Sequence, residues 1–69
     1  MSGQLIKYYK RIAQVGTQAG RSSGHGTPFV RAGNKLIQES NKKGLTKEFA
    51  TALKKEGKRL IQKGSSINH

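Results

Sequence analysis

The chain has 69 residues, of which 14 are Lys or Arg and three are glutamates, so its formal net charge is +11. It contains no Asp and no Cys. This composition excludes a Ser-His-Asp triad and cysteine-based staples, and it leaves too few acids for a paired-carboxylate or two-metal active site. We therefore expect a protein that is not an enzyme and that uses no cofactor and no metal.

The apolar content limits the size of the fold. Seventeen residues are apolar and larger than alanine, so the chain can form one small domain, residues 1–69, around a thin core. No apolar run approaches the roughly 20 residues that span a bilayer. The first residues also lack the apolar stretch of a secretory signal. We expect neither a transmembrane segment nor classical secretion.

The first predicted helix covers about residues 4–18. At about 100° per residue, its apolar side chains gather on one side, and cations and glutamines occupy the other. The residues that share the apolar side are Leu5, Tyr9, Ile12 and Gly16.

A Gly/Ser-rich stretch, predicted to be a loop over residues 19–26, follows the first helix. A phosphate-binding loop also precedes a helix, but His25 and Gly26 stand where the P-loop motif requires Gly and Lys. Nucleotide hydrolysis by such a loop is therefore excluded. Two interpretations remain: a flexible linker of small residues, or a generic phosphate contact near Arg21 at the free N–H groups of the next helix.

The second predicted helix covers about residues 28–41. Thr27 offers an N-cap hydroxyl, and Pro28 suits the first helical position. Residues 41–44, which end in glycine, indicate the end of the helix. Its apolar face consists of Phe29, Val30, Gly33, Leu36 and Ile37.

The third predicted helix covers about residues 47–63 and is followed by a short tail, residues 64–69. Glu48 lies in the first turn, where a negative charge suits the helix dipole. The apolar stripe consists of Phe49, Ala50, Leu53, Gly57, Leu60 and Ile61.

No segment shows the alternation typical of strands, so the expected fold is all-α, with three short amphipathic basic helices. The net charge is +4 for residues 1–27, +3 for 28–45 and +4 for 46–69. Each helix therefore carries its own cationic face. The helices form either a mini-bundle or an extended helical chain that a larger partner orders.

A weak internal repeat relates the second and third helices. Six residues that begin at Gly33 match six that begin at Gly57 at four positions, Gly, Leu, Ile and Gln. A glycine inside a helix costs about 1 kcal/mol relative to alanine, and a close approach of two backbones would offset that cost. Either the two helices cross near these glycines, or the repeat is a coincidence. The residues assigned to helix packing are Gly33, Leu36, Ile37, Gly57, Leu60 and Ile61.

Cations on three successive helices favour a polyanion partner, because a surface that serves only solubility normally mixes both signs of charge. Tyr9 is expected in the core, and Tyr8, at the edge of the apolar face, is the candidate for stacking on a base or a partner side chain. The predicted polyanion contacts are Lys7, Lys10, Arg11, Arg21, Arg31, Lys35, Lys42, Lys47, Lys54, Lys55 and Lys58.

Glu56 lies near the apolar side of the third helix and has two interpretations. It forms an ion pair with Arg59, three residues further on, which is worth a few tenths of a kcal/mol. Alternatively, it pairs with a cation from another helix or subunit and fixes their relative orientation.

Together these features predict a small, basic structural protein of a nucleoprotein assembly, a ribosome-type particle or the interior of a virion. It would bind nucleic-acid phosphates with little sequence specificity. The expected partners are the RNA or DNA backbone, larger coat or ribosomal-type proteins, or both, and no small-molecule substrate. The expected location is an intracellular nucleoprotein particle or a virion.

Two alternatives belong to other classes. A minor capsid or cement protein would hold larger protein subunits together through its apolar helix faces. A membrane-active cationic helical peptide would insert those faces into a bilayer surface, but the chain has no Trp, and Gly16, Gly33 and Gly57 dilute the apolar faces.

Overall fold

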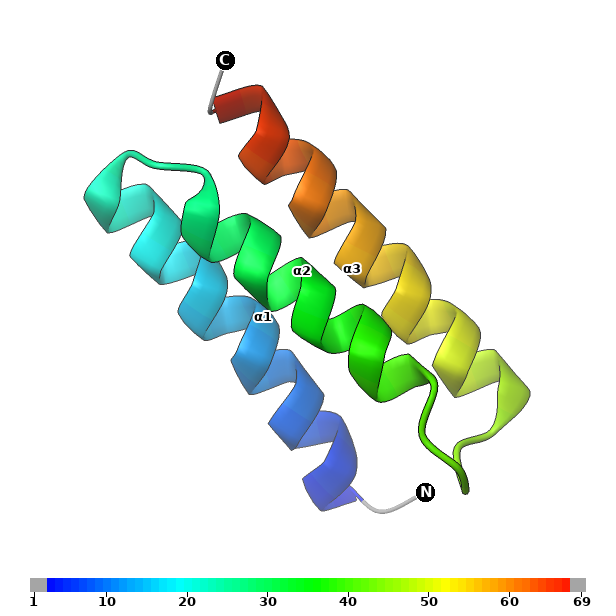
Figure 1. Ribbon diagram of the computed structural model, residues 1–69. Helices are drawn as coiled ribbons and strands as arrows, with labels where there is room; N and C mark the ends of the chain where they lie inside the picture. The colour runs from blue at the N-terminus through cyan, green and yellow to red at the C-terminus, as the bar shows by residue number, and fades with distance from the viewer. Residues whose placement is uncertain (1–2, 68–69) are drawn as a thin grey trace.

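The computed structural model describes residues 3–67, which form three helices: α1 (Gly3–Ser23), α2 (Thr27–Ser40) and α3 (Lys47–Ile67). α2 lies between α1 and α3 and runs antiparallel to both (Figure 1). No strand occurs within these residues. The all-α prediction is confirmed, and of its two forms the structure has the helical mini-bundle.

α2 is the central element of the bundle. It packs along both neighbours, whereas α1 and α3 make few contacts with each other. The body measures 36 × 19 × 13 Å, and its long axis is close to the roughly 31 Å that a 21-residue helix spans. The arrangement leaves one groove between α1 and α2 and another between α1 and α3.

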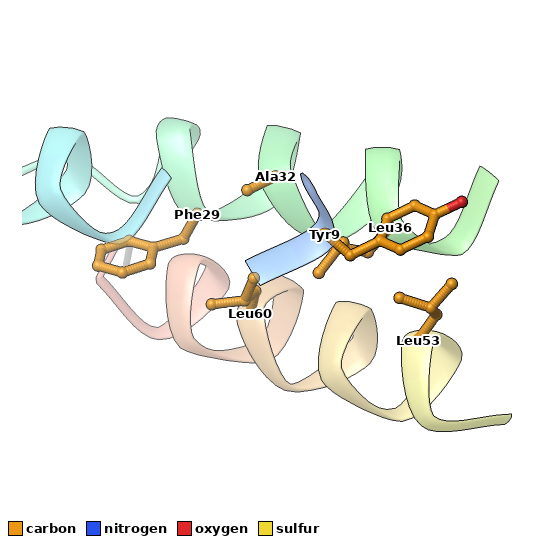
Figure 2. Packing of buried hydrophobic residues seen from close by; sticks show 6 residues of the cluster. All are labelled: Tyr9, Phe29, Ala32, Leu36, Leu53 and Leu60. Carbon is orange, nitrogen blue, oxygen red and sulfur yellow. The ribbon is translucent and has the colours of Figure 1, made fainter. Parts of the chain in front are cut away.

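The core is a single row of apolar side chains along α2 and α3, and Tyr9 of α1 lies over it (Figure 2). Its most deeply buried members are Phe29, Leu36 and Leu60, none of which exposes more than 1% of its surface. Full burial of one such side chain contributes about 1.5–3 kcal/mol. The remaining buried apolar residues of the described part are Tyr9, Ala32 and Leu53.

Paired glycines allow α2 and α3 to approach closely. Gly33 of α2 faces Gly57 of α3, and Gly26, seven residues before Gly33, faces Gly64, seven residues after Gly57. A methyl group on Gly57 would lie 2.6 Å from the carbonyl oxygen of Gly33. The structure thus brings together the two glycines of the sequence repeat, at positions where no larger residue fits without a shift of the backbone.

The predicted loop over residues 19–26 is wrong for most of its length, because α1 continues to Ser23. Gly20 is buried against the ring of Phe29, so a residue expected to make a linker flexible instead provides space for a core side chain. Ser23 donates from Oγ to the carbonyl of Gly20, and Gly24, at φ +72°, ends the helix. The prediction was wrong because it used only the local Gly/Ser-rich composition, which does not reveal the tertiary contact between Gly20 and Phe29.

The start of α2 also differs from the prediction. Gly26, not Thr27, is the N-cap residue; no side-chain hydrogen bond caps the helix, and Thr27 and Pro28 are its first two residues. Gly26 is packed against Gly64 of α3, a contact between distant residues that the local capping signal of Thr27 does not include. α2 ends at Ser40, one residue before the predicted end, and Gly44 in the following loop has φ +90°.

α3 begins as expected and ends later than expected. The backbone N–H of Phe49 donates to Thr46 Oγ1 at 3.2 Å, which caps the first turn. The predicted tail from residue 64 is wrong as far as Ile67, because Gly64 is buried against Gly26 and Phe29 and the helix continues through it. The last two residues of that tail, 68–69, lie outside the described residues.

Candidate polyanion-binding surface

Every cation assigned to polyanion binding is exposed in the structure. The set includes residues of all three helices and one residue of the loop between α2 and α3. Its members are Lys7, Lys10, Arg11 and Arg21 on α1, Arg31 and Lys35 on α2, Lys42 in the loop, and Lys47, Lys54, Lys55 and Lys58 on α3.

The described acids are distributed very unevenly over the bundle. α1 contains none, and α2 contains only Glu39, of which 7% is exposed. Tyr9 Oη donates to Glu39 Oε2 at 3.5 Å, and Lys42 Nζ lies 2.6 Å from the same oxygen. Consequently, α1 and α2 themselves present no exposed carboxylate to solvent.

The environment of Glu39 changes the pKa values of its two neighbours. Burial, followed by the nearby Glu39 carboxylate, raises the pKa of the Tyr9 hydroxyl above its usual value of 10.0. The hydrogen bond to Glu39 raises the pKa of the Lys42 ammonium above 10.5. Tyr9 therefore stays neutral and Lys42 stays charged at neutral pH. The buried Glu39 carboxylate thus has two partners, a buried hydroxyl and an ammonium group.

α3 has a different charge pattern because both of its glutamates are accessible. Glu48 is exposed in the first turn, and Glu56 accepts a hydrogen bond from Arg59 Nε at 3.1 Å. The bond to Arg59 lowers the pKa of Glu56 below its usual 4.5. Within the described residues this ion pair is intrahelical, as in the simpler of the two interpretations of Glu56. The cations of α3 thus share their surface with carboxylates.

The cationic side of α1 carries no acid of its own helix. Lys7, Lys10 and Arg21 lie on it, and the glutamines 14 and 18 lie between them. Lys10 and Arg21 also line the groove between α1 and α3, whose volume is about 590 Å³ and which Glu56 of α3 lines as well. Arg21 belongs to the last turn of α1 and not to a phosphate-cradling loop, so the contact expected at the start of α2 has no such loop to support it.

Tyr8 keeps the accessibility that stacking requires. It exposes 46% of its surface, and its ring is tilted by 59° against the ring of Tyr9 with a centroid separation of 5.3 Å. Tyr9, in contrast, is 5% exposed and packs on Phe49. The two adjacent tyrosines therefore have different positions, one in the core and one at the surface.

The packing residues occupy the interface between α2 and α3. Gly33, Leu36, Gly57 and Leu60 are buried, while Ile37 and Ile61 are half-buried at its edge. Each isoleucine lies over the glycine of the opposite helix: a methyl group on Gly57 would lie 2.7 Å from Ile37 Cγ1, and one on Gly33 would lie 2.6 Å from Ile61 Cγ1.

Two features were missed at the level of the sequence. The first is the burial of Glu39. This residue follows Leu36 by three residues and Ala32 by seven, a helical spacing that places it beside the apolar face, so its burial could have been predicted from the sequence. The second, the meeting of Arg11 of α1 with Arg31 and Lys35 of α2 around one groove, could not have been predicted, because helical periodicity describes each helix separately.

Residues 3–67 contain no cluster of three His, Cys, Asp or Glu side chains that could hold a metal. His25 is exposed between α1 and α2, and His69 lies outside the described residues. None of the described helices is long and apolar enough to cross a membrane. Comparison of the chain with models of protein families, with curated proteins and with solved structures finds no match. The surface itself is therefore the basis for any functional assignment.

Proposed function

We propose that the chain is a small, non-enzymatic structural protein of a nucleoprotein assembly, within an intracellular particle or a virion, and that it binds nucleic-acid phosphates with little sequence specificity. One observation carries this proposal. The surfaces of α1 and α2 combine six exposed cations on the two helices with no exposed carboxylate.

The arrangement of these cations suits a phosphate backbone. Along a helix axis, Lys7 and Lys10 are separated by about 4.5 Å and Lys10 and Arg21 by about 16 Å. A phosphate chain carries one charge per 3.4 Å of axis in each strand of a duplex, so Lys7 and Lys10 are spaced to contact neighbouring phosphates and Arg21 to contact a phosphate about five positions further along. Each neutralised phosphate releases condensed counterions, and this release, which depends on charge and not on base identity, drives binding.

The helical scaffold makes the cationic surface persistent. α1 is held against α2 by Tyr9 in the core and by the contacts of Gly16 with Ala32 and of Gly20 with Phe29. Because these contacts are internal to the chain, the cations of α1 keep their positions relative to those of α2 before any partner is bound. Binding then requires only the ordering of exposed Lys and Arg side chains.

The proposal is tested by measuring the affinity of the purified chain for fluorescent duplexes. Two unrelated duplex DNA sequences and one duplex RNA should bind with affinities that agree within a few-fold, and the affinity should fall by at least tenfold between about 50 and 200 mM salt. Binding of one sequence only, or binding that salt leaves unchanged, would contradict the proposal. Circular dichroism at each salt concentration checks that the bundle stays folded.

A further inference from the structure

The groove between α1 and α2 is an apolar depression on the surface, with a volume of about 420 Å³. Aliphatic and small residues from both helices form its inner lining. They are Ile12, Val15, Gly16, Ala19, Pro28 and Ala32. A methyl group on Gly16 would lie 3.1 Å from the carbonyl oxygen of Pro28, so the two backbones approach closely beneath the groove.

The groove exposes apolar surface to water. Val15 and Tyr8, which line it, are 56% and 46% exposed, more than any other large apolar side chain of the described part. Apolar surface gathered at one place and rimmed by polar groups is typical of an interaction site. The other groove, between α1 and α3, is lined instead with several polar side chains, among them Gln14, Thr17 and Glu56.

The rim of the groove has one sign of charge. Arg11 of α1 and Arg31 and Lys35 of α2 line it, all three are exposed, and no carboxylate lines it. The rim therefore favours an occupant that carries negative charge at its edges and apolar groups at its centre.

We infer that this groove docks an acidic amphipathic segment of a partner protein, with an aliphatic side chain against Val15 and Ala19 and carboxylates paired with the three rim cations. Charge complementarity selects this occupant. A second copy of the chain would bring its own cations against the rim, and nucleobases would leave their polar edges without partners against an aliphatic lining.

The docking groove lies on a different side of α1 from Lys10 and Arg21. At about 100° per residue, these two cations are about 120–180° away from Val15 and Ala19, whereas Lys7 is about 80° from Val15, between the two sides. One helix would thus contact nucleic acid on one side and an acidic protein segment on the other. Three of the six cations behind the proposed function, Arg11, Arg31 and Lys35, are here assigned to the protein segment. The inference rests in addition on the apolar lining, which phosphate binding does not need, so it can fail while nucleic-acid binding by Lys7, Lys10 and Arg21 holds.

The test uses a synthetic helical peptide with leucines on one face and glutamates on the other, titrated into the full chain labelled for methyl NMR. The methyl signals of Val15, Ala19 and Ala32 should shift on binding. A second peptide, with serine in place of leucine, should bind at least tenfold more weakly. Equal binding of both peptides would overturn the inference, because charge alone would then account for it.

Two alanine variants form a matched pair. Ala19 and Ala52 are both exposed and helical, but Ala19 lines the docking groove and Ala52 lines the groove between α1 and α3. Ala19→Glu should weaken peptide binding at least tenfold, since it places a carboxylate where the acidic peptide lies. Ala52→Glu, with the same change in net charge, should leave binding within twofold, and circular dichroism should show both variants folded.

Three further results would overturn the inference. They are an equal effect of the two variants, peptide-induced shifts confined to the methyl of Ala52, and shifts of the Val15 and Ala32 methyls by a thymidine oligonucleotide but not by the peptide. The last result would assign the groove to nucleic acid.

Discussion

Gly33 and Gly57 face each other across the interface of α2 and α3, each at the point where the opposite backbone passes. A methyl group on Gly57 would lie 2.6 Å from the carbonyl oxygen of Gly33, and a backbone atom cannot turn away as the end of a side chain can. The same relationship recurs one heptad away, between Gly26 and Gly64. The glycines that weaken each helix in isolation therefore permit the tight packing that holds the two helices together.

Gly57→Ala should lower the free energy of unfolding by about 1–3 kcal/mol, because the added methyl group forces the two backbones apart. The sign is diagnostic, since in an unhindered helix the same substitution would stabilise by about 1 kcal/mol. Urea unfolding followed by circular dichroism measures the difference.

Gly3→Ala is the matched control. Gly3 is also helical, but a methyl group built on it meets nothing within 4 Å. Its stability should be unchanged or higher by up to about 1 kcal/mol. If the two variants changed stability equally, close packing at Gly57 would not be the cause.

How far the sequence predicts this fold is clear at the glycines. The repeat around Gly33 and Gly57 was sufficient to suggest where α2 and α3 approach, because both glycines lie one turn before a Leu-Ile pair on an apolar face. Gly20 and Gly64 were instead assigned to a loop and a tail. They are helical because Phe29 and Gly26 pack on them, and such contacts join residues too far apart in the chain for a local pattern to show.

The sequence predicts which cations are exposed, but it does not predict which of them lie together on the folded bundle. Exposure of the cations follows from helical periodicity, which places them opposite the apolar stripes. The burial of Glu39 and the gathering of Arg11 with Arg31 depend on how α1 lies against α2. The burial of Glu39 leaves α1 and α2 without an exposed carboxylate. The gathering of Arg11 with Arg31 places cations on the rim of the docking groove.

Gly20→Ala tests the extension of α1 through the predicted loop. The added methyl group would lie 2.5 Å from Cδ2 of Phe29, so the variant should lose about 1–3 kcal/mol of stability. Phe29→Leu alone should also destabilise, but the double variant should lose less than the sum of the two single losses, because the smaller side chain leaves room for the methyl group. Thermal and urea unfolding of the three variants give the coupling. Strict additivity would show that Gly20 does not pack on Phe29.

Tyr9→Phe should make the bundle less sensitive to alkaline pH. Burial raises the pKa of Tyr9 in the folded state, so the unfolded chain loses this proton first, near pH 10.0. The stability that the neutral hydroxyl contributes is therefore complete below pH 10 and declines as the pH rises through the folded-state pKa. The raised pKa of Lys42 acts in the same direction above 10.5.

The measurement compares slopes rather than absolute stabilities, since Tyr9→Phe also removes the contact of the hydroxyl with Glu39. Between pH 9 and 11 the free energy of unfolding of the unmodified chain should fall more steeply, by up to about 1.4 kcal/mol per pH unit. Parallel slopes in the two proteins would mean that Tyr9 titrates equally in the folded and unfolded states.

Glu56→Gln should lower the free energy of unfolding slightly, and only at pH values where Glu56 is ionised. Arg59 lowers the pKa of Glu56, so the pair contributes stability above pH 4.5 and loses it as the pH falls through the folded-state pKa. Since both side chains are substantially exposed, the expected loss at neutral pH is about 0.2–0.5 kcal/mol. A loss above about 1 kcal/mol at neutral pH would indicate that Glu56 pairs with a cation of another helix or subunit.

The central claim, that the cationic side of α1 binds phosphates, is tested most directly by the salt dependence of duplex DNA binding in two triple variants. Lys7/Lys10/Arg21→Gln and Lys54/Lys55/Lys58→Gln each remove three exposed cations, the first set from α1 and the second from α3, where carboxylates share the surface. Each phosphate contact contributes about 0.9 to the slope of log affinity against log salt. The α1 variant should therefore reduce that slope by about 2–3, and the α3 variant should reduce it by less. An unchanged slope in the α1 variant, or a larger reduction in the α3 variant, would contradict the account.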